Sequence, residues 1–165
     1  AAFKWVQEHF LFLDTNGEEP STLDSILERA RAAVKRMGVR GLIIDPYNYI
    51  ESPRNDGTET TAISDMLTRV QKFCKAHDVH TWFVAHPSKI TRQGTEQPRP
   101  DGMSIAGSMA WWAKTDCGLT VHRREGKEVE IAVWKCRYRW VGTQGETVLN
   151  YSKTAGTYAE SLDAF

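Results

Sequence analysis

Apolar residues recur every three or four positions in two long segments, which is the spacing of one face of an α-helix. The first segment follows Ser21, which resembles an N-cap with Asp24 as its acidic partner, and it ends before Gly38, a frequent helix stop. The second segment runs from about Thr60 to His77. The apolar faces would consist of Leu23, Ile26, Leu27, Ala30, Val34 and Met37 in one helix and Ile63, Met66, Leu67, Val70, Phe73 and Cys74 in the other.

Shorter apolar runs lie between and after these helices, and their length is typical of strands. Strands that alternate with helices indicate an α/β fold with a mostly parallel sheet flanked by helices. A short helix near 105–114 and a turn at 124–127 separate the later runs, which would add antiparallel hairpin strands at one edge of the sheet. The strands expected on this pattern lie at residues 9–13, 41–45, 79–86, 117–123, 128–135 and 146–152.

Composition narrows the class of protein only slightly. The 165 residues carry 21 basic and 21 acidic side chains, so no global positive charge indicates nucleic acid, although a local basic strip would still suffice. The three cysteines form no CxxC pair, which favours reduced thiols in an intracellular protein. No apolar run is long enough to span a membrane, and no signal peptide opens the chain. We therefore expect a cytoplasmic protein, and the start without Met suggests a fragment of a longer chain.

Two polar side chains end successive predicted strands. Asp45 follows the apolar run Leu42–Ile44, and His86 ends the next strand. Parallel strands joined through a helix bring their carboxyl ends to one sheet edge, where α/β proteins bind ligands. An apolar strand that ends in Asp is the Walker B arrangement, in which the carboxylate holds Mg²⁺ beside nucleotide phosphates. The alternatives are that Asp45 caps the following turn and that His86 is a structural histidine.

A basic segment follows at 133–146, where a predicted strand carries Lys135 and Arg137 at the period-two spacing of one strand face. With Arg139 and an arginine across the hairpin, four cations would gather there. One interpretation is a phosphate clamp in which Arg137 acts as an arginine finger. The other is an edge strand that its positive charge protects from aggregation.

Two polar loops, 46–58 and 87–104, would leave the same sheet edge as Asp45. The second loop carries Lys89, Arg92 and Arg99, and long loops inside compact domains are usually functional. Basic loops of this kind can follow a phosphate backbone, but a merely solvated loop fits the sequence equally well.

Taken in order, these segments resemble the motor domain of ring-shaped replicative DNA helicases, the DnaB family, and within it the Twinkle-type and phage primase-helicase branch. The resemblance rests on "GLIIDPYNY" as the Walker B segment and on "HTWFVAHPSKI" as the next motif. It continues through "SIAGSMAWWAKTDCGLTVHR", "VWKCRYRWVGTQG" and "LNYSKTAGTYAE". The order and spacing agree over nearly all of residues 1–165, which would form a single partial RecA-like ATPase domain.

The resemblance implies roles for individual residues. Asp45 would hold the Mg²⁺ of bound Mg-ATP, or of another nucleoside triphosphate, and His86 would sense the γ-phosphate. Arg137 would be the finger inserted into the ATP site of the neighbouring subunit, with Lys135 beside it. These residues would act together in a homo-hexameric or heptameric ring.

The same resemblance implies that the two loops face the central channel and grip single-stranded DNA. Asn48 and Arg54 would contribute from the first loop, and Lys89, Arg92 and Arg99 from the second. The His at position 86 resembles the phage branch, so a phage or prophage source is expected.

One family motif is missing. The chain has no Gly-x-x-x-x-Gly-Lys-Ser/Thr phosphate loop, and the catalytic glutamate would lie upstream of Ala1. The chain alone is therefore expected to be inactive, since that loop supplies the amides and lysine that cradle the phosphates. The other interpretations are a different RecA-fold ATPase, such as a recombinase-like protein or a plasmid replication helicase, and a non-catalytic DNA- or protein-binding module.

Overall fold

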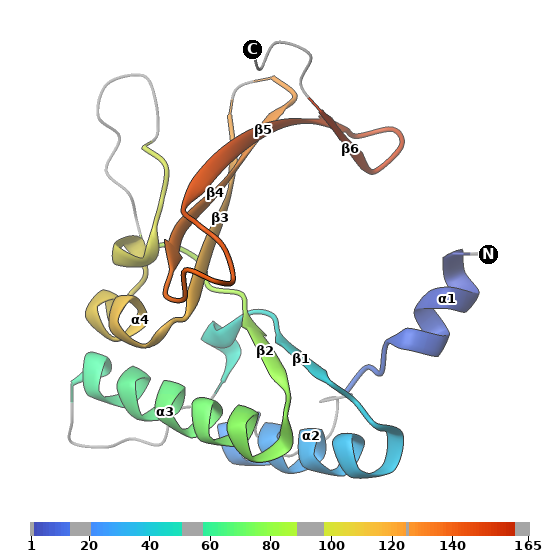
Figure 1. Ribbon diagram of the computed structural model, residues 1–165, viewed down its shortest axis with the longest axis vertical. Coiled ribbons are helices and arrows are strands. Elements are labelled where there is room, and N and C mark those ends of the chain that lie inside the picture. Colours follow the sequence, from blue (N-terminus) through green and yellow to red (C-terminus); the bar gives the residue numbers. More distant parts are fainter. Residues whose placement is uncertain (1, 14–20, 51–57, 89–97, 125, 161–165) are drawn as a thin grey trace. The chain divides into compact units, whose positions relative to one another are not determined.

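The computed structural model describes residues 2–13, 21–50, 58–88, 98–124 and 126–160 (Figure 1). The chain divides into two compact units, residues 1–55 with 69–85 and residues 56–68 with 86–165. The helices are α1 (Ala2–His9), α2 (Leu23–Met37), η1 (Tyr47–Tyr49), α3 (Glu59–His77), η2 (Gly102–Ser104) and α4 (Ser108–Lys114). The strands are β1 (Gly41–Ile44), β2 (His80–Phe83), β3 (Cys117–Arg123), β4 (Glu128–Cys136), β5 (Gly145–Ser152) and β6 (Thr157–Glu160).

The first unit is built on a parallel pair of strands. β1 and β2 lie in register from Gly41 opposite His80 to Ile44 opposite Phe83, and α2 and α3 lie side by side next to this pair (Figure 1). Alternation along β1 buries Leu42 and Ile44. The buried residues of the helices in this unit are Leu23, Leu27, Ala30, Ala33, Val70 and Phe73, so the predicted helical periodicity is confirmed.

The ends of α2 show where the sequence pattern was right and where it was wrong. Gly38 adopts a left-handed conformation (φ 70°) and its N–H donates to the carbonyl of Val34, as expected of a C-terminal glycine. The N-cap is Thr22 and not Ser21, because the Thr22 hydroxyl accepts from the N–H of Ser25 at 3.2 Å. The prediction missed this end by one residue.

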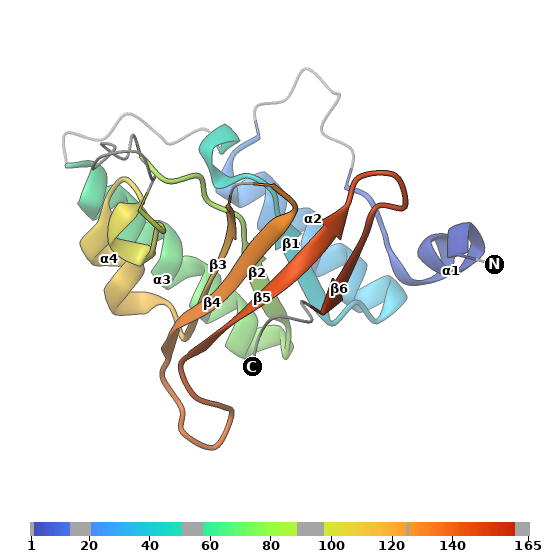
Figure 2. The same ribbon diagram turned by 90° about the horizontal axis from the view of Figure 1, so that it is seen from above.

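The second unit contains an antiparallel sheet in the order β3-β4-β5-β6, whose strands follow one another side by side (Figure 2). The expected turn between β3 and β4 is confirmed by the hydrogen bond from Arg124 N–H to the Glu128 carbonyl and by Gly126 at φ 79°. A bulge interrupts the ladder between Gly118 and Leu119. Ala110, Trp111, Val129 and Ala132 are among the buried residues of this unit.

Two expectations about the sheet were wrong for the described residues. The strands form a parallel pair and a separate four-stranded antiparallel sheet, so the described strands are mostly antiparallel and not mostly parallel. No strand forms at residues 10–13, and α1 extends through His9. A strand needs a neighbour to accept and donate its backbone hydrogen bonds, and in the described residues β1 pairs with β2 alone.

Candidate functional site

Asp45 lies directly after β1, with an exposed side chain. The turn η1 that follows has Pro46 at its N-cap position and no side-chain capping hydrogen bond. Asp45 therefore does not cap η1. In the described part of the chain no hydrogen bond or ion pair engages its carboxylate, which leaves both oxygens open to solvent or to a ligand.

The ends of β1 and β2 are joined by backbone hydrogen bonds just beyond the strands. Val84 N–H donates to the Ile44 carbonyl at 2.9 Å, and Tyr47 N–H donates to the Val84 carbonyl at 3.0 Å. These two bonds fix the backbone on both sides of Asp45. His86 lies two residues after Val84, and its ring is exposed.

The predicted DNA-binding residues are only partly described. Asn48 lies in η1 with an exposed side chain, whereas Arg54, Lys89 and Arg92 lie outside the described residues. The ends of the second loop are joined, because the Ser88 N–H and hydroxyl both donate to the Ser104 carbonyl at 2.7 Å. Segment 89–103 is therefore closed at its base in the manner of an Ω-loop.

Arg137 and Lys135 both donate to backbone carbonyls at the C-terminal end of α4. Arg137 Nη2 donates to the carbonyls of Ala113 at 2.6 Å and Thr115 at 3.3 Å, and its Nε forms an ion pair with Asp116 at 2.8 Å. Lys135 Nζ donates to the carbonyl of Trp112. Free carbonyls and the helix dipole make a helix C-terminus favourable for cations. Both side chains are thus held in place by their own subunit.

The electrostatics of this pair follow from burial and proximity. Partial burial lowers the pKa of Lys135, the charge of Arg137 lowers it further, and Asp116 opposes the shift. β4 lies between β3 and β5 in the sheet, so these cations do not protect an edge strand as one interpretation held.

Arg99 belongs to an ion-pair network in the second unit. Its Nη1 donates to Oε1 of Glu130 on β4 and to Oε2 of Glu146 on β5, while Arg124 contacts Oε2 of Glu130 at 2.8 Å. Hydrogen bonds from Glu146 and Glu130 raise the pKa of Arg99. Sequence reasoning singled out neither glutamate. DNA binding by Arg99 stays a prediction, but the structure gives this cation two carboxylate partners already.

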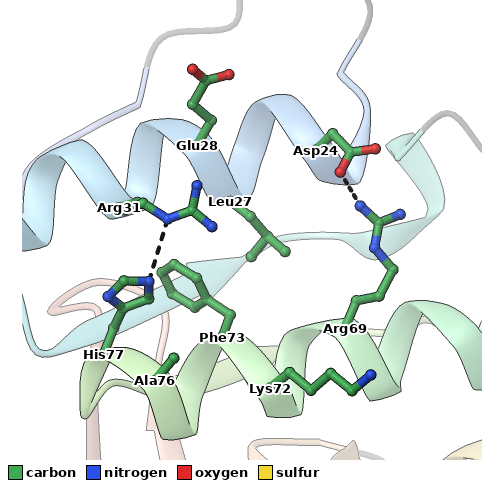
Figure 3. Close-up of a pocket in the computed structure, with 9 residues that line it drawn as sticks. All are labelled: Asp24, Leu27, Glu28, Arg31, Arg69, Lys72, Phe73, Ala76 and His77. Carbon is green, nitrogen blue, oxygen red and sulfur yellow. Dashed lines mark hydrogen bonds and ion pairs between the residues drawn. The ribbon is translucent and has the colours of Figure 1, made fainter.

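A groove of about 460 Å³ lies in the first unit between α2 and α3 (Figure 3). Ion pairing and hydrogen bonding cross it, from Arg69 to Asp24 and from Arg31 Nε to His77 Nε2 at 3.3 Å. The lining residues are Asp24, Leu27, Glu28, Arg31, Arg69, Lys72, Phe73, Ala76 and His77. None of the predicted site residues belongs to this groove. In the described residues no group of three potential metal ligands is present, and no helix is apolar and long enough to cross a membrane.

Comparison with known proteins gives one clear relative. The chain is 38% identical, over 96% of its length, to the Twinkle homolog protein, chloroplastic/mitochondrial, of Arabidopsis thaliana. Two solved structures share the fold with TM-scores of 0.70 at 19% identity, one of them an isolated ATPase domain and the other a DnaB-like replicative helicase. No family model matches the chain.

The expected resemblance to the DnaB family of replicative helicases is confirmed. The structural likeness covers 86% of this chain in both cases, so the fold is RecA-like, as in those two structures. This chain spans 23% of the length of the Arabidopsis protein, 52% of the isolated ATPase domain and 36% of the DnaB-like helicase. The phage or prophage source stays a prediction.

Proposed function

We propose that this chain is part of an ATP-dependent replicative DNA helicase that couples Mg-ATP hydrolysis at subunit interfaces to translocation on single-stranded DNA. The observation that carries the proposal is the 38% identity to a Twinkle homolog over 96% of the chain. The active assembly would be a homo-hexameric or heptameric ring. Since the chain lacks a phosphate loop, a further part of the protein would supply it.

Asp45 fits the role of a metal-binding carboxylate. Mg²⁺ in nucleotide sites retains several waters and takes one or two carboxylates together with the phosphates, so a single exposed carboxylate suffices. The side chain is exposed, does not cap η1, and stands on a backbone fixed by the hydrogen bonds of Val84 and Tyr47. Bound Mg-ATP would supply the phosphoryl group that is transferred to water, and Asp45 would orient the hydrated cation.

Arg137 fits the role of a finger that acts on a neighbouring subunit. A guanidinium has five N–H groups. In the described residues its Nε and Nη2 are bound to Asp116, Ala113 and Thr115, while Nη1 has no partner. The two Nη1 donors are therefore available to a phosphate without loss of the contacts that position the side chain. Lys135 would add a second positive charge beside it.

His86 and the two loops would connect the nucleotide to DNA. His86 leads directly into the segment whose base is closed by Ser88 and Ser104, so a change at the histidine would reach this loop through two residues of backbone. Residues 46–58 and 87–104 would contact the strand, with Lys89 and Arg92 as phosphate-binding cations.

The test is ATP hydrolysis by the full-length protein, with and without single-stranded DNA. We expect stimulation by DNA and its loss in Arg137→Ala, with nucleotide binding nearly intact because the finger acts across the interface. Lys153→Ala, an exposed change in the turn between β5 and β6, serves as the matched control. Equal loss of binding in Arg137→Ala would contradict a role in trans.

A mixing experiment separates a trans from a cis role. Subunits with Asp45→Asn and subunits with Arg137→Ala are each expected to be inactive alone. In a mixed ring, an interface with Asp45 from one variant and Arg137 from the other is complete, so hydrolysis should reappear. No gain on mixing would place both residues in one subunit's site. Absence of hydrolysis in the wild type would favour the non-catalytic binding module.

A further inference from the structure

Two of the three cysteines lie directly opposite each other on neighbouring strands. Cys117 is the first residue of β3 and Cys136 is the last residue of β4, and the ladder pairs them. Side chains of directly opposed residues in an antiparallel pair extend from the same face of the sheet. Both thiols are free, Cys117 is exposed, and Cys136 is half-buried.

The hydrogen-bond pattern brings this pair closer than an average cross-strand pair. Arg137 N–H donates to the Asp116 carbonyl at 2.8 Å, so Asp116 and Arg137 occupy a hydrogen-bonded position of the ladder. Such positions alternate with non-hydrogen-bonded ones, which places Cys117 and Cys136 at a non-hydrogen-bonded position. There the Cα atoms are about 4.5 Å apart, and their side chains are closer than at hydrogen-bonded positions. A disulfide spans Cα separations from about 4.4 to 6.8 Å, so the backbone need not move.

The Cys136 thiol now serves the turn that follows β4. Its Sγ donates to the carbonyl of Gly142 at 3.2 Å, with a longer contact to the carbonyl of Tyr138 at 3.5 Å. Rotation about one side-chain bond would turn the sulfur from these carbonyls toward Cys117. These weak thiol bonds are the contacts that a new covalent bond would replace.

We propose that Cys117 and Cys136 are a redox-sensitive dithiol that closes to a cross-strand disulfide when a hydroperoxide oxidises it. The exposed Cys117 thiolate attacks the peroxide and becomes a sulfenic acid, with release of one water from hydrogen peroxide. The Cys136 thiolate then attacks the sulfenic sulfur and expels the oxygen as a second water. Two thiols lose two hydrogen atoms, one S–S bond forms, and the peroxide is reduced to two waters.

The new bond would directly flank the Asp116–Arg137 pair of the same ladder, and it would free the Tyr138 and Gly142 carbonyls from the thiol. Oxidation would therefore alter the segment that carries Arg137. The proposal concerns the thiols themselves and holds whether or not Arg137 acts as a finger.

The test is thiol counting on the chain after treatment with hydrogen peroxide. Residual thiols are labelled with a maleimide in denaturant, and the intact mass is measured. The reduced chain should take three labels, one for each cysteine, and the oxidised chain should take one. The remaining label should map to Cys74, and a non-reduced digest should contain the peptide of Cys117 joined to that of Cys136.

Serine variants make the assignment specific. Cys74→Ser should still close the bond and take no label after oxidation, whereas Cys117→Ser and Cys136→Ser should form no intramolecular disulfide. Cys74 lies in the other unit beside Thr81, so it is a matched control. A disulfide to Cys74, a bond between two chains, or Cys117 oxidised to sulfinic acid without any bond would each overturn the proposal. Thiol counting requires no ATPase activity, so its failure is distinguishable from failure of the proposed helicase function.

Discussion

Glu130 is the buried charge of the second unit, and its removal has a calculable consequence. Only 5% of its side chain is exposed, and its two oxygens are bound by Arg99 and Arg124. Burial by itself raises the pKa of this carboxyl, but the hydrogen bonds and charges of the two arginines outweigh burial, so the pKa lies below its ordinary value. The ionised form is thus stabilised in the folded chain.

The variant Glu130→Gln keeps the shape but loses the charge and places an amide N–H₂ against a guanidinium. Breaking a buried ion pair by removal of one partner costs about 3–5 kcal/mol. Here the arginine side chains are 37% and 46% exposed and can be rehydrated, so we expect a loss in unfolding free energy of about 2–3 kcal/mol. Glu146→Gln removes the other partner of Arg99, but Glu146 is 62% exposed, so about 1 kcal/mol or less is expected.

The assay is urea unfolding as a function of pH, with hydrogen exchange of β4 and β5 peptides to localise the effect. Because the folded pKa of Glu130 is lowered, its contribution is full above the unfolded value of 4.5 and is lost as pH falls through the folded pKa. The difference between wild type and Glu130→Gln should therefore shrink in acid. A difference that is constant with pH, or an equal loss in Glu146→Gln, would refute a role for the buried charge.

Three further predictions concern other parts of the chain. Neutralisation of Lys89 and Arg92 should weaken single-strand binding by the full-length protein and reduce the slope of log K against log salt by about 0.7 for each lost phosphate contact. An unchanged slope would place DNA elsewhere. Closure of the disulfide between Cys117 and Cys136 should raise the unfolding free energy in urea by about 3 kcal/mol, and a decrease would indicate strain. Thr22→Ala should cost about 1 kcal/mol in thermal unfolding, while the same change at the preceding serine should cost less.

Features that depend on neighbours in sequence could be predicted. The two long helices follow from apolar spacing, and Gly38 adopts the left-handed conformation that its position at the helix end predicts. The turn between β3 and β4 follows from the polar residues between two β runs. Features that depend on distant partners could not be predicted. Residues 10–13 have the composition of a strand but no strand beside them among the described residues, and composition alone provides no hydrogen-bond partner.

The candidate site divides along the same line. The exposure of Asp45 was unexpected, because a carboxylate after a buried strand was expected to need a partner. The network of Glu130 was missed since its partner Arg99 lies 31 positions away in sequence, and a glutamate within a β run is ordinarily an exposed residue. One signal was available, because Glu130 lies in the most apolar strand of the hairpin region. Even so, nothing local indicates which arginine it would meet.

The contacts of Arg137 bear directly on the choice between a phosphate clamp and a purely structural cation. A long side chain loses about 1.5–2 kcal/mol of rotamer freedom when it is fixed. In this structure Ala113, Thr115 and Asp116 already fix it through Nε and Nη2. A phosphate that meets Nη1 would therefore gain a charge-assisted hydrogen bond without that entropic cost. An ion pair with Asp116 alone would not need the two additional carbonyls at the end of α4. The arrangement thus has the preorganisation that stabilisation of a developing negative charge requires, which favours the finger over the structural interpretation.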